Sequence, residues 1–114
     1  MIYREPLPID RKDVEKALSG SDARHAAETV IRMAMNEPDL EWAQRMCLAA
    51  VRDFRTEVVL AGLTGLGHLA RRFRTLNLSL VLPAVRCHLK DEKYGGVAED
   101  VLDDIAVFVH TPSE

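Results

Sequence analysis

The sequence is poor in the residues from which metal sites and disulfide frameworks are built. Its 114 residues include two cysteines, Cys47 and Cys87, and no CxxC pair. Both lie in stretches with helical periodicity, so we expect buried free thiols rather than a disulfide. Cys87 and His88 are adjacent and would point about 100° apart on a helix, and no two histidines are spaced as HxxxH. The sequence therefore predicts no metal site and no cofactor.

Targeting and membrane-spanning signals are also lacking. The start, MIYREPLPID, has no apolar run and carries two acids, which is not the pattern of a signal peptide. No stretch approaches the ~18 apolar residues of a membrane span. We therefore expect a cytoplasmic protein that does not enter a membrane. Residues 1–9 contain Pro6 and Pro8 and are predicted to form an extended arm, and residues 111–114 a polar tail.

What the sequence does have is the composition of one soluble domain. Apolar residues make up 47% and charged residues 29%, and 114 residues are enough to bury a core without disulfides. We interpret residues 1–114 as a single domain. The net charge of −3 argues against a general nucleic-acid binder.

The most apolar stretch, residues 53–71, is predicted to be the central helix. Its apolar residues recur every three or four positions and so share one helical face: Val59, Leu63, Leu66 and Ala70. Further apolar residues beside them leave little polar surface, so this helix should be buried on most sides. Each interior glycine costs about 1 kcal/mol relative to alanine. The presence of Gly62, Gly65 and Gly67 therefore suggests that another backbone passes close by.

Five more helices are predicted from the same spacing, over residues 10–19, about 21–35, 38–52, 77–90 and 97–110. Asp10 and Ser21 are the expected N-caps of the first two, and Pro38 suits a first helical turn. Pro83 should bend the fifth helix or delay its start. The alternating leucines of residues 76–82 are the best strand candidate, but the apolar pattern continues at helical spacing to Leu89. We therefore expect an all-α protein.

Apolar positions repeat between alternate helices. Ala27, Val30 and Ala34 precede Leu63, Leu66 and Ala70 by 36 residues, and these precede Leu102, Ile105 and Val109 by 39. The intervening helices agree at an offset of 38, from Leu40 and Leu78 onward. Alternating helices with short links and a near-constant offset are typical of helical repeats.

The stretches DFRTEVVLAGLTGLGHLA and LSLVLPAVRCHLKD resemble the second and first helices of HEAT-like repeats, with Pro83 at a common bend and Asp91 at the turn. The second-helix match departs from the family in lacking a clear basic residue. The resemblance covers roughly residues 10–109 and implies a short right-handed α-solenoid of about six antiparallel helices. Such stacks bind protein or nucleic acid. The His-Glu pairs that hold iron in some HEAT-like enzymes do not occur here, so we expect no enzyme.

Charge is unevenly distributed along the chain. Residues 52–90 carry seven Lys/Arg and two Asp/Glu, whereas residues 91–114 carry one and seven. The basic excess includes a cluster just after the central helix: Arg71, Arg72 and Arg74. The acids of the last predicted helix lie opposite its apolar face: Glu99, Asp100, Asp103 and Asp104. They are i,i+4 neighbours that repel one another, although acids near a helix start are partly compensated by the helix dipole.

Three function classes follow from these features. Small helical-repeat proteins of this kind resemble bacterial immunity proteins, which neutralise a toxin that is often a cationic nuclease. On this hypothesis the acidic helix binds a basic toxin domain. The alternatives are a regulatory adaptor or scaffold subunit, and a weak nucleic-acid contact through the arginine cluster. In each case we expect a monomer or weak dimer.

Overall fold

The structure, a computed structural model, describes residues 9–109. Within this range the chain forms six helices and no strand. The helices are α1 (Arg11–Ser19), α2 (Ala23–Asn36), α3 (Leu40–Val51), α4 (Thr56–Phe73), α5 (Leu78–Arg86) and α6 (Gly95–Phe108). The all-α prediction is confirmed. The predicted arm over most of residues 1–9, the end of the last helix at His110 and the polar tail lie outside the described residues.

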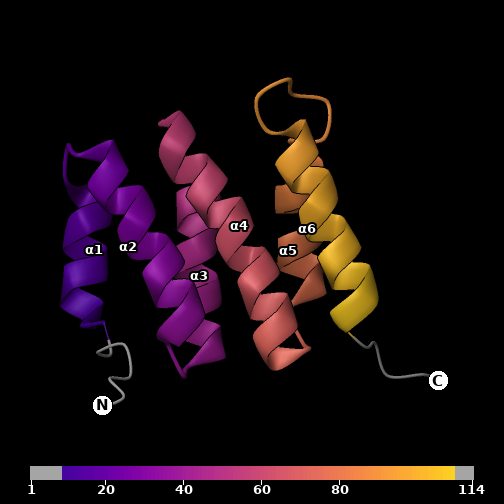
Figure 1. Ribbon diagram of the computed structural model, residues 1–114, viewed down its shortest axis with the longest axis horizontal. Helices are drawn as coiled ribbons and strands as arrows, with labels where there is room; N and C mark the ends of the chain where they lie inside the picture. The colour runs from indigo at the N-terminus through magenta and orange to yellow at the C-terminus, as the bar shows by residue number, and fades with distance from the viewer. Residues whose placement is uncertain (1–8, 110–114) are drawn as a thin grey trace, which may run out of the picture.

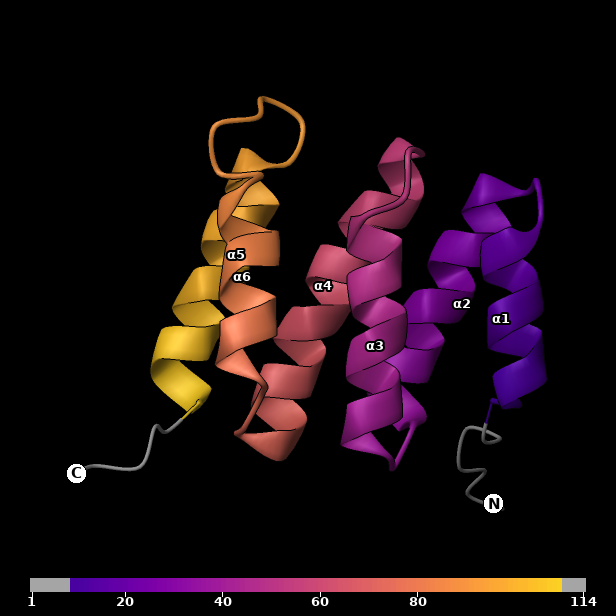
Figure 2. The same cartoon turned by 180° about the vertical axis from the view of Figure 1, so that it is seen from behind.

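The helices form two layers in which successive hairpins stack side by side. Helices α2, α4 and α6 lie in one layer and run in the same direction (Figure 1), and α1, α3 and α5 form the layer behind them (Figure 2). The alternating helices that the sequence comparison paired therefore occupy the same layer. This is the solenoid-like arrangement predicted from the repeat, while membership of the HEAT-like family stays a prediction.

Helix α4 is the centre of the stack, in contact with α2, α3 and α6. The four residues predicted to share its buried face, Val59, Leu63, Leu66 and Ala70, are at most 2% exposed. At Gly62 the backbone of α3 passes so close that an added Cβ would lie 2.6 Å from the Val51 nitrogen. Gly65 instead faces the Cys47 thiol and the Ala34 side chain. Close packing of helices thus explains both glycines, but of these two only Gly62 has another backbone close by, as the sequence predicted.

Three carboxylates set the helix starts, and two of them correct the predicted boundaries. Asp10 caps α1 by accepting a hydrogen bond from the Lys12 amide, as predicted. Helix α2 is capped by Asp22 rather than Ser21, because the Asp22 carboxylate reaches the free His25 amide. Helix α3 starts at Leu40 rather than near Pro38. Its N-cap is Asp39, which accepts from the Trp42 amide.

The fifth and sixth helices also differ from their predicted ranges. Pro83 lies inside α5, which nevertheless starts at Leu78, so the proline does not delay it. The helix ends at Arg86 rather than Lys90. The residues that follow form tighter turns with hydrogen bonds between residues three apart, such as the bond from the His88 amide to the Val85 carbonyl. Helix α6 starts at Gly95, two residues earlier than predicted, and ends at Phe108.

Burial departs from prediction at two places. On α2 the buried alanine of the first turn is Ala26, whereas Ala27, one of the repeated apolar positions, is only half-buried. Cys47 is buried, but Cys87, which lies just after the end of α5, is exposed. Both are free thiols, as expected. None of the helices within residues 9–109 has the length and apolar character needed to cross a membrane.

Candidate protein-interaction surface

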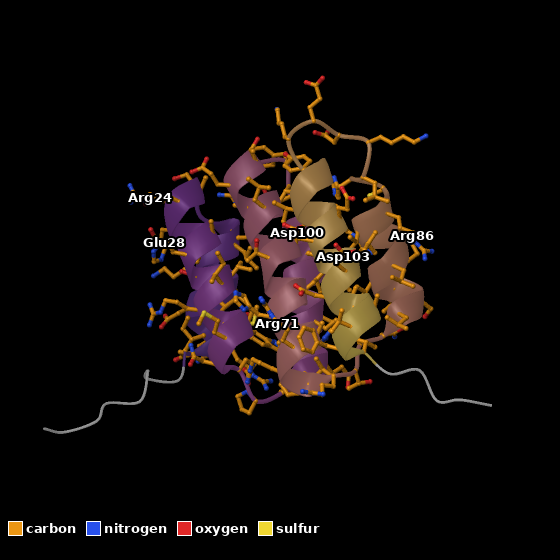
Figure 3. The ribbon with its side chains drawn as sticks, turned by 45° about the vertical axis from the view of Figure 1, so that its right-hand side comes forward. Arg24, Glu28, Arg71, Arg86, Asp100 and Asp103 are labelled. Atoms are coloured by element: carbon orange, nitrogen blue, oxygen red, sulfur yellow. The ribbon has the colours of Figure 1, made fainter. Side chains whose placement is uncertain are left out.

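One side of α6 is acidic, whereas its buried apolar residues face the rest of the stack, where α6 contacts α4 and α5. Ala98, Val101 and Ile105 recur at helical spacing and are buried. The remaining positions include Glu99, Asp100 and Asp103, which are exposed, and Asp104, which is half-buried. Figure 3 shows Asp100 and Asp103 along α6, with Arg71 on the neighbouring α4. We call the four carboxylates together the acidic face.

The helix dipole does little to relieve the repulsion within this acidic face. Because α6 begins at Gly95, its first turn contains no acidic residue. The sequence had placed the helix start at Val97, which would have brought Glu99 into the first turn. The dipole effect fades within that turn. The predicted compensation is therefore smaller than expected, and the acids repel one another across solvent.

A cleft of about 240 Å³ lies between α4 and α6, beside the acidic face. Its charged lining comes from Asp100 and Asp104 on α6 and from Arg71 on α4. Gly67 forms part of its floor, and a Cβ there would lie 2.9 Å from a carboxylate oxygen of Asp104. Gly67 therefore makes room for a charged side chain, whereas Gly62 makes room for a backbone.

Arg71 lines the cleft without being paired to its carboxylates. Among the ion pairs of residues 9–109, none joins Arg71 to Asp100 or Asp104. The guanidinium instead donates a hydrogen bond to Nδ1 of His68, at 3.1 Å. Burial lowers the pKa of His68 and Arg71 lowers it further, while Asp104 acts in the opposite sense. The imidazole is therefore neutral near pH 7 and adds no positive charge beside the two carboxylates of the cleft.

The three arginines after the central helix do not form one patch. Arg72 turns toward α2 and donates to the carbonyl oxygens of Ala34 at 2.7 Å and Glu37 at 3.0 Å, where it satisfies acceptors left free at that helix end. Arg74 ends α4 with a left-handed φ of 57°, and its guanidinium lies 5.8 Å from the centre of the Phe108 ring. A role for these arginines in partner binding stays a prediction.

A larger cleft, of about 710 Å³, lies at the other end of the stack between α1 and α2. Two of its carboxylates, Asp10 and Asp22, are already engaged as helix caps. The remaining charged side chains are of both signs, and include Asp13, Lys16 and Arg32. This larger cleft has no single charge character, so the acidic face is the better-defined candidate.

Nowhere in residues 9–109 do three or more His, Cys, Asp or Glu side chains gather so that they could hold a metal ion. The neighbouring Cys87 and His88 are not brought to a common site: Cys87 donates to the Ala84 carbonyl, and the His88 ring packs edge-on against Tyr94.

Comparisons with known proteins bear on what such a surface does. No protein-family model matches the chain, and no curated protein matches it either. Chains of solved structures do match it. The chain is similar to a chain of a CDI complex. That crystal structure is of a CDI complex from Cupriavidus taiwanensis LMG 19424, and the two chains superpose with a TM-score of 0.78 at 26% sequence identity. The match covers 95% of this chain and 96% of that chain, so it extends over all six helices.

Proposed function

We propose that this chain is an immunity protein that binds and neutralises a toxin domain. The observation that carries the proposal is the end-to-end similarity to a chain of a CDI, or contact-dependent inhibition, complex. Such a complex pairs a toxin with its immunity protein. In this proposal the chain takes the part of the immunity protein and acts by binding rather than by catalysis.

The acidic face is the surface that we assign to the toxin. Glu99, Asp100 and Asp103 are exposed, and none of them is engaged in an ion pair of residues 9–109. A cationic toxin surface would relieve their mutual repulsion on binding. Complementary charge also raises the association rate, which suits a protein that must capture a toxin before it acts. The nucleic-acid alternative is not carried forward, because the three arginines point to different neighbours.

The test is protection of cells from the protein encoded immediately upstream of this chain's gene. That protein is expressed from an inducible promoter with or without this chain, and growth is followed. We expect the upstream protein to stop growth and this chain to restore it. Asp100→Lys with Asp103→Lys should lose protection, whereas Glu15→Lys with Glu28→Lys should keep it.

The control pair is matched to the test pair. Both double variants change net charge by the same amount at exposed helical positions, but Glu15 and Glu28 lie on α1 and α2, away from the acidic face. Glu28 pairs with Arg24 at 3.3 Å, but both side chains are exposed, so the loss of this pair should cost little. Asp104 is left unchanged because it is half-buried against Gly67. Full protection by the Asp100→Lys, Asp103→Lys variant would show that the acidic face is not the binding surface. No protection by the wild type would contradict the immunity function itself.

A further inference from the structure

Phe54 is the most exposed large apolar side chain in residues 9–109. It lies in the link between α3 and α4 and is 90% exposed, whereas the next most exposed, Val107, is 64% exposed. Single apolar residues on a surface are ordinary and need no explanation. Phe54 is different because of how firmly the link that carries it is held.

The neighbouring residue, Arg55, clamps this link to the rest of the stack. Its guanidinium donates to both carboxylate oxygens of Asp53, at 3.0 and 3.1 Å. It also donates to the carbonyl oxygens of Leu18 at 2.8 Å and Gly20 at 2.6 Å, at the end of α1. The Arg55 amide adds a hydrogen bond to the Asp53 carboxylate, at 2.9 Å. Two charged side chains on either side of Phe54 therefore fix its backbone.

This clamped link lies at the same end of the molecule as the start of α6. The α1–α2, α3–α4 and α5–α6 connections all lie along one edge of the stack (Figure 1). Thr56, two residues after Phe54, lies 3.5 Å from the hydroxyl of Tyr94, which directly precedes α6. Glu99 and Asp100 are in the second turn of α6, next to this edge. A protein bound to the acidic face near its first residues therefore also reaches the edge that carries Phe54.

We propose that Phe54 is an apolar anchor of the interface with the toxin domain and enters an apolar recess that borders the toxin's basic surface. This inference rests on the proposed function and adds a second contact to it. Aromatic side chains dominate the energetics of interface centres. An anchor that is already fixed in position loses little conformational entropy on binding, so more of its contact energy appears as affinity. The Arg55 clamp supplies that pre-organisation.

The two contacts should affect different rate constants. Exposed charges mainly change the association rate and its dependence on salt. A buried apolar anchor mainly changes the dissociation rate. Loss of a hot-spot side chain costs about 2 kcal/mol or more, which corresponds to a roughly thirtyfold weaker complex. We expect Phe54→Ala to raise the dissociation rate by about this factor at both low and high salt.

The experiment measures binding kinetics between the full chain and the protein encoded immediately upstream, at two salt concentrations. The variants are Phe54→Ala and, as a matched control, Val107→Ala, which truncates an exposed apolar side chain in the last turn of α6. Because Phe54 is 90% exposed, its truncation should leave the circular dichroism and melting temperature unchanged. Sedimentation of the chain alone tests whether Phe54 instead contacts a second copy.

Faster dissociation of Phe54→Ala with an unchanged association rate, and wild-type kinetics for Val107→Ala, would support the anchor. If Phe54→Ala dissociates at the wild-type rate, the anchor is overturned. The proposed function would still stand in that case if binding continued to depend on Asp100 and Asp103. Self-association that Phe54→Ala abolishes, with toxin binding unchanged, would assign Phe54 to a second copy and overturn the inference. No binding by the wild type would overturn the proposed function, and this inference with it.

Discussion

Replacing Gly62 by alanine tests the packing around which the whole stack is built. An alanine Cβ at this position would meet three atoms of α3: the Val51 nitrogen at 2.6 Å, the Cys47 carbonyl oxygen at 2.8 Å and the Ala50 Cβ at 2.9 Å. Two of these belong to the backbone, so the contact cannot be relieved by a change of side-chain rotamer. Helices α3 and α4 would have to move apart.

The size of the effect follows from two opposing terms. Alanine in place of glycine favours a helix interior by about 1 kcal/mol. Overpacking in a close-packed core costs about 1–3 kcal/mol and occasionally more, and contact with a rigid backbone places Gly62→Ala at or above the upper end. We expect a net loss of about 2 kcal/mol in the free energy of unfolding, which corresponds to a fall of roughly 8 °C in melting temperature.

The assay is urea unfolding followed by circular dichroism, with Gly96→Ala as the control. Gly96 lies in the first turn of α6, and a Cβ there would have no atom within 4 Å. Gly96→Ala should therefore be neutral or stabilising by up to about 1 kcal/mol. If Gly62→Ala were as stable as Gly96→Ala, the close approach of α3 to α4 would be wrong, and with it the explanation of why glycine occupies this position.

Two further predictions concern ionisable side chains in and beside the core. Burial raises the pKa of Cys47 to about 12. Titration of the native protein with Ellman's reagent should therefore detect one rapidly reacting thiol, Cys87, and should detect Cys47 only in denaturant. Two rapidly reacting thiols in the native protein would contradict the packing of α3. Hydrogen bonds from Arg55 lower the pKa of Asp53 in the folded protein. The ionised carboxylate therefore stabilises the fold fully above its unfolded pKa of about 3.9, and this stabilisation is lost as the pH falls through the lower folded pKa. Asp53→Asn should melt below the wild type at neutral pH, with a gap that closes in acid, and a gap independent of pH would refute this role.

Much of the fold follows from helical spacing alone. The spacing of Val59, Leu63, Leu66 and Ala70 identified the buried face of α4, because apolar periodicity survives in any packing that covers one side of a helix. The repeat offsets paired α2, α4 and α6 correctly, since equivalent helices of a stack face equivalent neighbours. Boundaries were less predictable. Whether Ser21 or Asp22 caps α2 depends on which of the two adjacent residues is the last before the helix begins, and both residue types are good N-caps, so the sequence does not decide between them.

The candidate site was predictable as a charge pattern but not as a geometry. The four acids of α6 could be listed from the sequence, and three of them are exposed as expected. The arginine cluster was a cluster only along the chain, because neighbouring positions on a helix point about 100° apart and so face different helices. The cleft shared by Asp100, Asp104 and Arg71 depends on the approach of α6 to Gly67, which no local pattern specifies. The Arg55 clamp likewise joins segments 35 and 37 residues apart.

Capture of a cationic toxin by the acidic face is tested most directly by the association rate with the upstream-encoded protein at two salt concentrations. Screening acts over about 8 Å at physiological ionic strength, so steering by exposed charge weakens as salt is added. We predict that the wild type associates rapidly and is slowed by salt. Asp100→Lys with Asp103→Lys should associate roughly tenfold more slowly and lose most of that salt dependence, whereas Glu15→Lys with Glu28→Lys should behave as the wild type. Equal, salt-independent association of all three folded proteins would contradict the claim.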